Sequence, residues 1–178
     1  PDDPVVWRGP MFGKAIQQLF QDVRWGDVDC AIVDLPPGTG DAQLSLSQLL
    51  PLNGAIMVTT PQEVALADVR RAINMFRTVN VPVLGVVENM SGFVTPDGVT
   101  HDIFGAGGGA ALSEQYGIPL LGSIPIDPQI RIGGDSGEPS AMHPEAGPGA
   151  VFQSVARKTM ALLESGDDAA RPQLDVVN

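Results

Sequence analysis

The hydrophobic positions along this chain form two kinds of pattern, short apolar runs and longer stretches with helical spacing. The short runs stand between turn residues, within 28–34, 54–60, 82–88 and 119–124. Runs of this length without polar alternation are typical of strands that are buried on both faces of a parallel sheet. Because helix-length segments separate them, the pattern predicts a three-layer α/β fold, a parallel sheet flanked by helices.

Helical spacing is clearest at 61–80, where an apolar face recurs at intervals of three and four residues. That face is made by Ala65, Leu66, Val69, Ala72, Ile73, Phe76 and Val79. Further helices are predicted at 14–24, 41–50, 107–116 and 149–164. Asp127 followed by Pro128 predicts one more helix start, with the acid as N-cap and the proline in the first turn.

The segment 93–102 has turn residues at its centre, Pro96, Asp97 and Gly98, with β-branched residues on either side. This arrangement predicts a small hairpin that lies outside the sheet. From Gly166 onward the chain is acidic and aperiodic, which predicts a mobile tail over 166–178. The remainder, 1–165, is expected to form a single domain.

Composition narrows the possible functions. The formal charge is −11 and no basic stripe is present, so nucleic-acid binding is not expected. No apolar run reaches the roughly 18 residues of a membrane span, so no membrane partner is expected either. The lone cysteine, Cys30, excludes an internal disulfide, and its place in an apolar run predicts a small buried hydrophobe. The chain begins at Pro1 without a signal-peptide pattern, and we interpret it as an excised piece of a cytoplasmic protein.

The stretch that offers the most chemistry follows the apolar run 30–33. Asp34 ends that run, and two prolines and Gly38 come after it. A carboxylate at the carboxyl end of a parallel strand points to the crevice where open α/β sheets bind ligands. Gly38 leaves backbone N–H groups that can approach an anion closely. The residues alone leave two interpretations open: an acid aimed at a metal ion before a phosphate-binding loop, or an acid that caps a turn.

The segment 34–41, Asp-Leu-Pro-Pro-Gly-Thr-Gly-Asp, resembles the Walker B and switch II segment of the Mrp-type P-loop ATPases, which are relatives of MinD and ParA. Other matches follow in the family's order, at 7–11, 58–62, 87–91, 103–109 and 124–128. The resemblance covers 5–137. It implies a P-loop NTPase fold and an ATP-binding iron–sulfur cluster carrier. Such a protein would hydrolyse Mg²⁺-ATP as a homodimer and serve apo iron–sulfur client proteins.

The resemblance also implies roles for individual residues on the phosphate side. Asp34 would hold the Mg²⁺ shell through water, and Gly38 would offer its N–H to the γ-phosphate. Pro36 and Thr39 belong to the same nucleotide-binding loop.

On the base side, the resemblance gives Asn89 the adenine edge, for which an amide supplies both a donor and an acceptor. The far wall of that pocket would be formed by Pro125, Ile126 and Asp127. The residues alone also allow an Asx-turn at Asn89 and a plain helix cap at Asp127. Charged residues at 68–71 would lie at a dimer interface by resemblance, or on a solvated helix face by pattern.

The sequence departs from the family pattern in two places. Many members carry Cys-Pro-x-Cys in the hairpin, whereas Thr95 and Gly98 stand in those positions here. Neither is a thiolate, so a cluster bridged by this hairpin is not expected. The family's Gly-Lys-Gly-Gly-x-Gly-Lys-Ser/Thr loop should precede Trp7 and is absent from this sequence. The lysines and backbone N–H groups that bind the phosphates, and the strand before them, are therefore expected to be missing.

Two other functions remain open at this point. A MinD- or ParA-like positioning ATPase would use a basic or amphipathic carboxyl segment, which the acidic pair Asp167 and Asp168 argues against. An interaction module without nucleotide binding is the other alternative.

Overall fold

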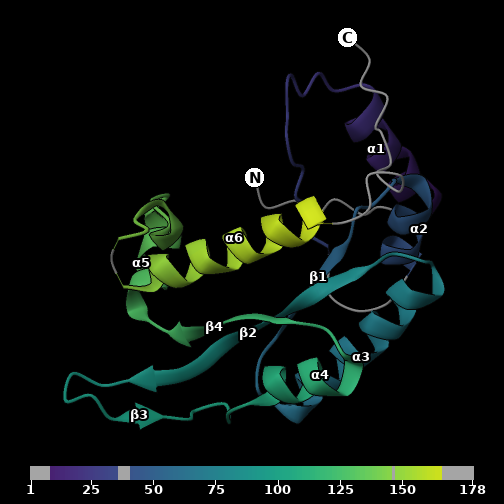
Figure 1. Cartoon of the computed structure of the whole chain (residues 1–178). Helices are drawn as coiled ribbons and strands as arrows, with labels where there is room; N and C mark the ends of the chain where they lie inside the picture. Colours follow the sequence, from purple (N-terminus) through teal and green to yellow (C-terminus); the bar gives the residue numbers. More distant parts are fainter. Residues whose placement is uncertain (1–8, 36–40, 146, 166–178) are drawn as a thin grey trace.

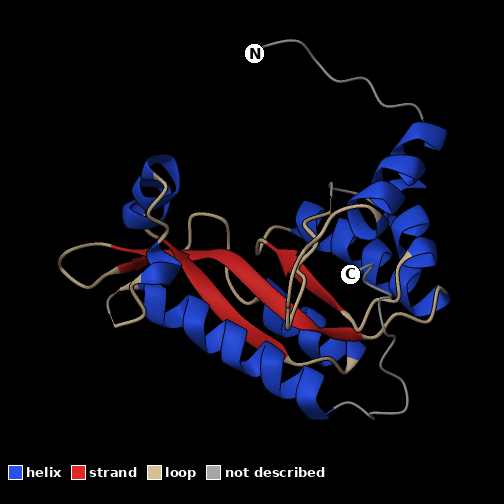
Figure 2. Ribbon diagram, turned by 90° about the horizontal axis from the view of Figure 1, so that it is seen from above, coloured by secondary structure: helices blue, strands red, loops and turns tan. Residues whose placement is uncertain are grey.

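The computed structural model of this chain describes residues 9–35, 41–145 and 147–165. A sheet lies between helices on both of its faces (Figures 1 and 2). Its strands are β1 (Ala55–Thr59), β2 (Val83–Val94), β3 (Thr100–His101) and β4 (Leu120–Ile126). The helices are α1 (Gly9–Gln21), α2 (Asp41–Leu49), α3 (Glu63–Thr78), α4 (Gly108–Tyr116), α5 (Pro128–Ser136) and α6 (Pro148–Ser165), with a 3-10 turn η1 (Ser140–Met142) before α6.

Strand β2 is central in the sheet. It pairs in parallel with β1 on one side and with β4 on the other, and its far end pairs antiparallel with β3. The strands predicted at 54–60, 82–88 and 119–124 are therefore confirmed as parallel neighbours. The α/β fold with a parallel sheet between helices is confirmed with them.

Helices α3 and α4 cover one face of the sheet, and α5 and α6 cover the other over β2 and β4 (Figure 1). On the first face Val86 packs with Ile73 of α3 and Leu112 of α4. On the second face Val87 packs with Leu121 and with Val155 of α6. Successive residues of a strand point to opposite faces, and both faces are covered here. This explains why β2 carries an apolar run without polar alternation.

Helices α1 and α2 form a smaller cluster beside the sheet. Its buried residues are Ile16, Leu46 and Leu50, and Val33 and Leu35 pack against them. Helix α1 begins earlier than predicted, at Gly9, and ends at Gln21 rather than at Arg24. The predicted helix after Asp41 is confirmed.

The segment 28–34 is not a strand, contrary to the prediction. No strand is assigned anywhere in 22–35, and Ile32 is 93% exposed. A strand forms only where a neighbour satisfies its N–H and C=O groups. Within the described residues β1 pairs with β2 alone, and no strand lies beside 28–34 to satisfy its backbone groups.

Cys30 is exposed, which corrects the expectation of a buried thiol. The expectation depended on a strand covered by helices on both faces. Because the apolar run 30–33 lies outside the sheet, no helix layer covers this side chain.

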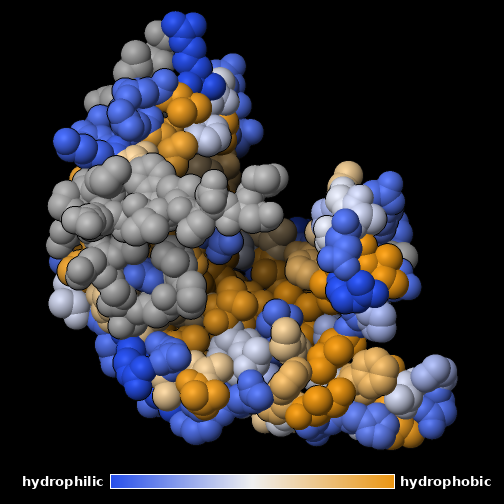
Figure 3. Space-filling model, turned by 180° about the vertical axis from the view of Figure 1, so that it is seen from behind, coloured by the Kyte–Doolittle hydropathy of each residue, from blue (hydrophilic) through white to orange (hydrophobic). Residues whose placement is uncertain are grey.

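The open edge at β1 leaves apolar surface. Met57 and Thr59 are buried, whereas Ile56 and Val58 on the opposite face are 38% and 59% exposed. Seen from behind, the molecule is hollowed, and the floor of the hollow is mostly apolar (Figure 3).

The hairpin predicted at 93–102 is present, but it is continuous with the sheet rather than outside it. Strand β2 runs on to Val94, and Phe93 and Val94 pair with the two residues of β3. Figure 1 shows the hairpin extending past the helical layers at the far end of β2. None of the helices in the described ranges combines the length and the hydrophobicity that crossing a membrane requires.

Candidate functional site

Strands β1 and β4 end on either side of β2, which continues into the hairpin. The register sets Thr59 of β1 beside Glu88 of β2, and Glu88 beside Ser123 of β4. One step further along, Asn89 lies opposite Ile124. The carboxyl ends of parallel strands are where open α/β sheets bind ligands. The fold therefore brings two predicted site segments, Asn89 and 125–127, to the same edge.

Asn89 begins an irregular stretch of β2. The register with β4 passes from Asn89–Ile124 to Phe93–Ile126, four steps on β2 against two on β4. Met90 and Gly92 have φ angles of 56° and 77°, in the left-handed region. For a methionine this conformation costs roughly 1–3 kcal/mol, and strain of this kind gathers at functional sites.

The Asn89 side chain takes part in this bulge. Its Oδ1 accepts a hydrogen bond from the Met90 N–H at 2.9 Å. This bond comes from the next residue, whereas the Asx-turn that the sequence allowed would use the N–H two residues on. The amide N–H₂ group has no partner among the described residues and is half-buried, so two donors remain for a ligand.

The segment after β4 forms the neighbouring wall. Pro125 and Ile126 are half-buried at the strand end, and the carboxylate of Asp127 accepts the Gln129 N–H at 2.8 Å. Asp127 is thereby confirmed as the N-cap of α5, with Pro128 in the first turn. This capping bond holds the turn after Ile126 in place.

A buried carboxylate next to Asn89 was not singled out by sequence reasoning. Glu88 is 3% exposed. Its Oε2 accepts the Gly109 N–H at 2.6 Å, and its Oε1 accepts the Ser91 hydroxyl at 2.6 Å. Helix α4 begins after Gly107, which has no side chain to cap it, so Glu88 supplies the acceptor for the first turn. A signal was available: an acid inside an otherwise apolar run must find partners.

The glycines that open α4 allow this close approach. A Cβ on Gly109 would lie 2.8 Å from the Glu88 Cβ, and one on Gly108 would lie 2.9 Å from the Pro61 carbonyl oxygen. Both distances are too short for a side chain. The glycine run at 107–109 therefore sets α4 against the ends of β1 and β2.

The predicted phosphate-side residues are only partly within the described structure. Asp34 is exposed and makes no hydrogen bond or ion pair with the described residues. Pro36, Gly38 and Thr39 lie outside the described residues. The structure thus assembles the base-side segments at one sheet edge and does not join Asp34 to them by any contact that it describes.

The hairpin carries Thr95 and Gly98 in its turn. The Gly98 N–H donates to the Thr95 carbonyl at 2.8 Å, and the Thr95 hydroxyl donates to the Asp97 carboxylate. That hydrogen bond lowers the pKa of the Asp97 carboxyl below its usual value. Across the described ranges, no three His, Cys, Asp or Glu side chains come together as a metal site.

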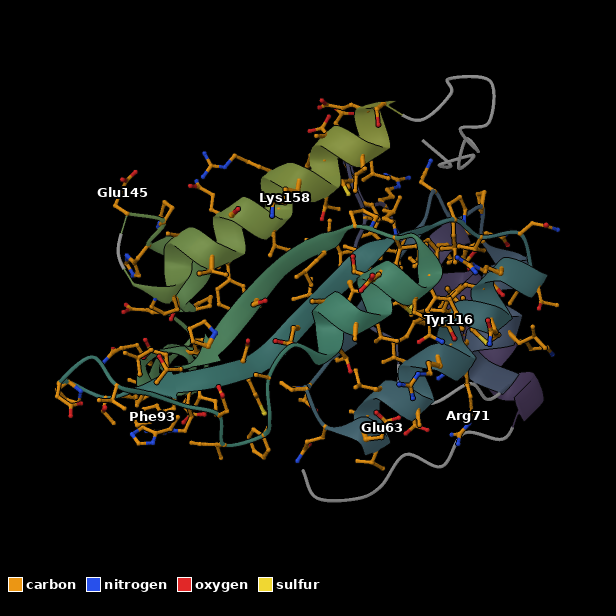
Figure 4. The ribbon with its side chains drawn as sticks, turned by 60° about the horizontal axis from the view of Figure 1, so that its bottom comes forward. Glu63, Arg71, Phe93, Tyr116, Glu145 and Lys158 are labelled. Carbon is orange, nitrogen blue, oxygen red and sulfur yellow. The ribbon has the colours of Figure 1, made fainter. Side chains whose placement is uncertain are left out.

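Charged side chains project from α3, where Figure 4 labels Glu63 and Arg71. Arg70 lies 2.5 Å from the Glu63 carboxylate, and Arg71 contacts Asp68. The hydrogen bond from Arg70 lowers the pKa of the Glu63 carboxyl. At the other end of the helix, Arg77 donates to the Tyr116 carbonyl at 2.7 Å and so joins α3 to α4.

Comparison with known proteins shows the family to which this chain belongs. A ParA family model, described as NUBPL iron-transfer P-loop NTPase, matches residues 1–160. The chain belongs to this family. An iron–sulfur cluster carrier protein from Deinococcus radiodurans is 58% identical over 155 residues, covering 86% of this chain and 44% of the relative. The chain thus spans about half the length of the curated relatives it matches.

Solved structures agree with the fold. A nucleotide-binding protein from Archaeoglobus fulgidus, in complex with ADP, is similar with a TM-score of 0.60 and 32% identity, covering 92% of this chain and 59% of that one. The cell division ATPase MinD from Pyrococcus furiosus has a TM-score of 0.62 at 23% identity, covering 89% of this chain and 63% of that one. The second likeness concerns the fold alone. Together these two likenesses show that the chain has the P-loop NTPase fold of the MinD type.

Proposed function

We propose that this chain forms the base-binding and Walker B part of an Mrp-type, ATP-hydrolysing iron–sulfur cluster carrier. The observation that carries the proposal is the strained bulge at Asn89, which presents unpaired amide donors at the carboxyl edge of the sheet beside 125–127. Membership of an iron-transfer P-loop NTPase family supports the same function.

The base-binding role follows from what the edge offers. Asn89 has two free N–H donors, and Pro125 and Ile126 supply half-buried apolar surface next to them. A purine ring needs apolar walls and a few directional polar groups at its edge. The similar Archaeoglobus protein is in complex with ADP, which supports nucleotide binding by this fold.

The phosphate side of the proposal uses Asp34, Pro36, Gly38 and Thr39. The Asp34 carboxylate is exposed and unpaired within the described residues, which fits an acid that would hold the water shell of a Mg²⁺ ion. Bound there, the ion would neutralise charge on the phosphates. Gly38 would offer its N–H group to the γ-phosphate.

The iron–sulfur cluster would be the cargo of this protein rather than a resident cofactor. The chain has one cysteine, so this chain cannot supply the four ligands of a cluster on its own. We propose a cytoplasmic homodimer in which nucleotide hydrolysis changes the dimer conformation, with apo iron–sulfur proteins as recipients. The family match and the relatives named as cluster carriers support this assignment.

Asn89→Ala in the full-length protein tests the base contact. We expect the affinity for ATP to fall while that for GTP changes less, because the lost hydrogen bonds are to the base. The loss should be about 1–3 kcal/mol. Calorimetry with both nucleotides measures it, and Asn74→Ala, an exposed position on α3, is the matched control. Equal weakening of ATP and GTP would refute the base-contact role.

Asp34→Asn tests the hydrolytic role. Turnover should fall much more than nucleotide affinity, since the carboxylate is proposed to organise the metal shell rather than the whole phosphate grip. Asp29→Asn, at another exposed acid of the same segment, should leave both unchanged. Unchanged turnover of Asp34→Asn at saturating Mg²⁺-ATP would reject the assignment.

A further inference from the structure

The carboxylate of Glu88 connects two parts of the fold that lie far apart along the chain. Ser91, three residues later, donates to one oxygen, and Gly109, at the start of α4, donates to the other. Between these two partners the chain runs out along the hairpin and back. Glu88 therefore joins the two ends of the segment 90–108, which contains the hairpin.

The same carboxylate stabilises the bulge that presents Asn89. Met90 and Gly92 hold left-handed φ angles, and β2 gains two residues on β4 between Asn89 and Phe93. A regular strand would send these residues to alternate faces with ordinary angles. The Ser91–Glu88 hydrogen bond lies across the left-handed residue Met90, and the Asn89–Met90 bond adds to it.

We propose that Glu88 is a positioning residue that fixes Asn89 for adenine recognition by holding the 89–92 bulge against the start of α4. The inference depends on the nucleotide role proposed above for Asn89. Glu88 itself is 3% exposed and both of its oxygens are engaged, so it acts through Asn89 rather than on the nucleotide.

The tight packing around the carboxylate supports a fixed position. Gly109 leaves no room for a Cβ beside the Glu88 Cβ, and Leu120 of β4 lies at the same point. The buried carboxylate accepts two short hydrogen bonds, each 2.6 Å, which allow it little movement. A change that removes either bond should therefore loosen the bulge before it loosens the strands.

Ser91→Ala in the full-length protein is the decisive variant, because it removes the bulge-side bond and leaves the α4 bond intact. We expect the ratio of ATP to GTP affinity to fall about three- to tenfold, and the Met90 amide to exchange hydrogen faster. Ser113→Ala is the matched control, since its hydroxyl also makes one part-buried 2.6 Å bond, to the Ile118 carbonyl. The control should leave the ratio unchanged.

Substitutions at Glu88 test the carboxylate directly. Glu88→Gln retains an acceptor for the Gly109 N–H and an amide that can donate to Ser91, so it should stay close to the wild-type ratio. Glu88→Ala removes both bonds and should lower the ratio at least as far as Ser91→Ala. If Glu88→Ala does not fold, the serine variant still decides.

A double variant distinguishes positioning from general damage. In the Asn89→Ala background, Ser91→Ala should change the ATP to GTP ratio by less than about twofold, because the group being positioned is gone. If Asn89→Ala lowers the ratio and Ser91→Ala does not, the inference is overturned while the proposed function stands. If Asn89→Ala leaves the ratio unchanged, the base contact of the proposed function fails and the positioning role falls with it.

Discussion

Two apolar runs of similar length and composition have opposite outcomes in this chain. Residues 55–58, Ala-Ile-Met-Val, form most of β1, and Met57 is 5% exposed. Residues 30–33, Cys-Ala-Ile-Val, form no strand, and Ile32 is 93% exposed. The first run pairs with β2 and is covered by α3. The second has no strand beside it among the described residues, and Val33 packs against the α1–α2 cluster while Ile32 faces solvent.

The difference shows what a strand requires beyond apolar side chains. Backbone N–H and C=O groups must be satisfied by a neighbour, and the side chains must be covered. Strand β1 is hydrogen-bonded to β2 and is covered on the face of Met57 and Thr59. On its opposite face Ile56 and Val58 remain exposed. Changes in the two regions should therefore differ in the size of their effect.

The largest expected effect is on nucleotide affinity, which should differ between residues 1–178 and the full-length protein. Residues 1–178 produced alone should not bind Mg²⁺-ATP measurably, because they contain the proposed base-binding segments but no loop ending in Gly-Lys-Ser or Gly-Lys-Thr. Each charge-assisted phosphate bond contributes roughly 1.5–3 kcal/mol, and about 1.4 kcal/mol is a factor of ten. Calorimetry on these residues and on the full-length protein measures the difference. Micromolar binding by residues 1–178 would mean that another phosphate site exists.

The same substitution in each region should have very different effects on stability. Ile73→Ala removes a fully buried side chain between α3 and the sheet, and we expect the free energy of unfolding to fall by about 2–5 kcal/mol. Ile32→Ala should change it by less than about 0.5 kcal/mol, because that side chain is already in water. Urea unfolding of residues 1–178 measures both. A large loss at Ile32 would show that the run 30–33 is covered in solution.

The packing of α4 against Glu88 can be tested with a glycine pair. Gly109→Ala would set a Cβ 2.8 Å from the Glu88 Cβ and should lower the free energy of unfolding by about 1–3 kcal/mol. Gly134→Ala, in α5 with open space around it, should raise it by up to about 1 kcal/mol, because alanine favours helix. Thermal unfolding measures both signs. A tolerated Gly109→Ala would contradict the close approach.

Apolar surface at the open edge of β1 should cause self-association of residues 1–178. Val58→Lys should reduce that association and change the free energy of unfolding by only about 0.5 kcal/mol, since Val58 is 59% exposed. Val64→Lys makes the same change at a 74% exposed position of α3 and serves as the control. Sedimentation velocity compares the two. Equal reduction by both variants would indicate a general charge effect instead of an edge contact.

The smallest expected effect concerns the ion pair on α3. Because the Arg70 hydrogen bond lowers the Glu63 pKa from 4.5, its contribution to stability is present above that value and is lost as pH falls through the lower, folded-state pKa. Arg70→Gln should return the pKa of Glu63 toward 4.5. A carboxyl-detected NMR titration measures it, and an unchanged pKa would show that the pair does not persist in water.

Much of the fold could be predicted from sequence because its signals are local. The apolar periodicity gave α3, the turn residues gave the hairpin at 95–98, and Asp127-Pro128 gave the start of α5. Element ends moved by a few residues, most of all in β2, which continues past Glu88 into the hairpin. A pattern of apolar residues does not indicate at which residue pairing with another strand stops.

The candidate site was named mainly from the resemblance to a family, which pointed to Asn89 and to 125–127. The structure confirms the helix cap at Asp127, which residue type alone predicted, and the base contact of Asn89 stays a prediction. Glu88 was passed over, although it makes the shortest contacts at this edge, because its partners Ser91 and Gly109 meet it only in the folded chain.

The sequence by itself determined the kinds of element, their order and the family, since these depend on residue type and spacing along the chain. Tertiary structure decided which apolar runs became strands, that Cys30 is exposed, and that Glu88 joins the Asn89 bulge to α4. The physical reason is that strands and buried charges are completed by partners from elsewhere in the chain. Residue type determines which hydrogen bonds and packing contacts a residue can make, and the fold determines which partner makes them with it.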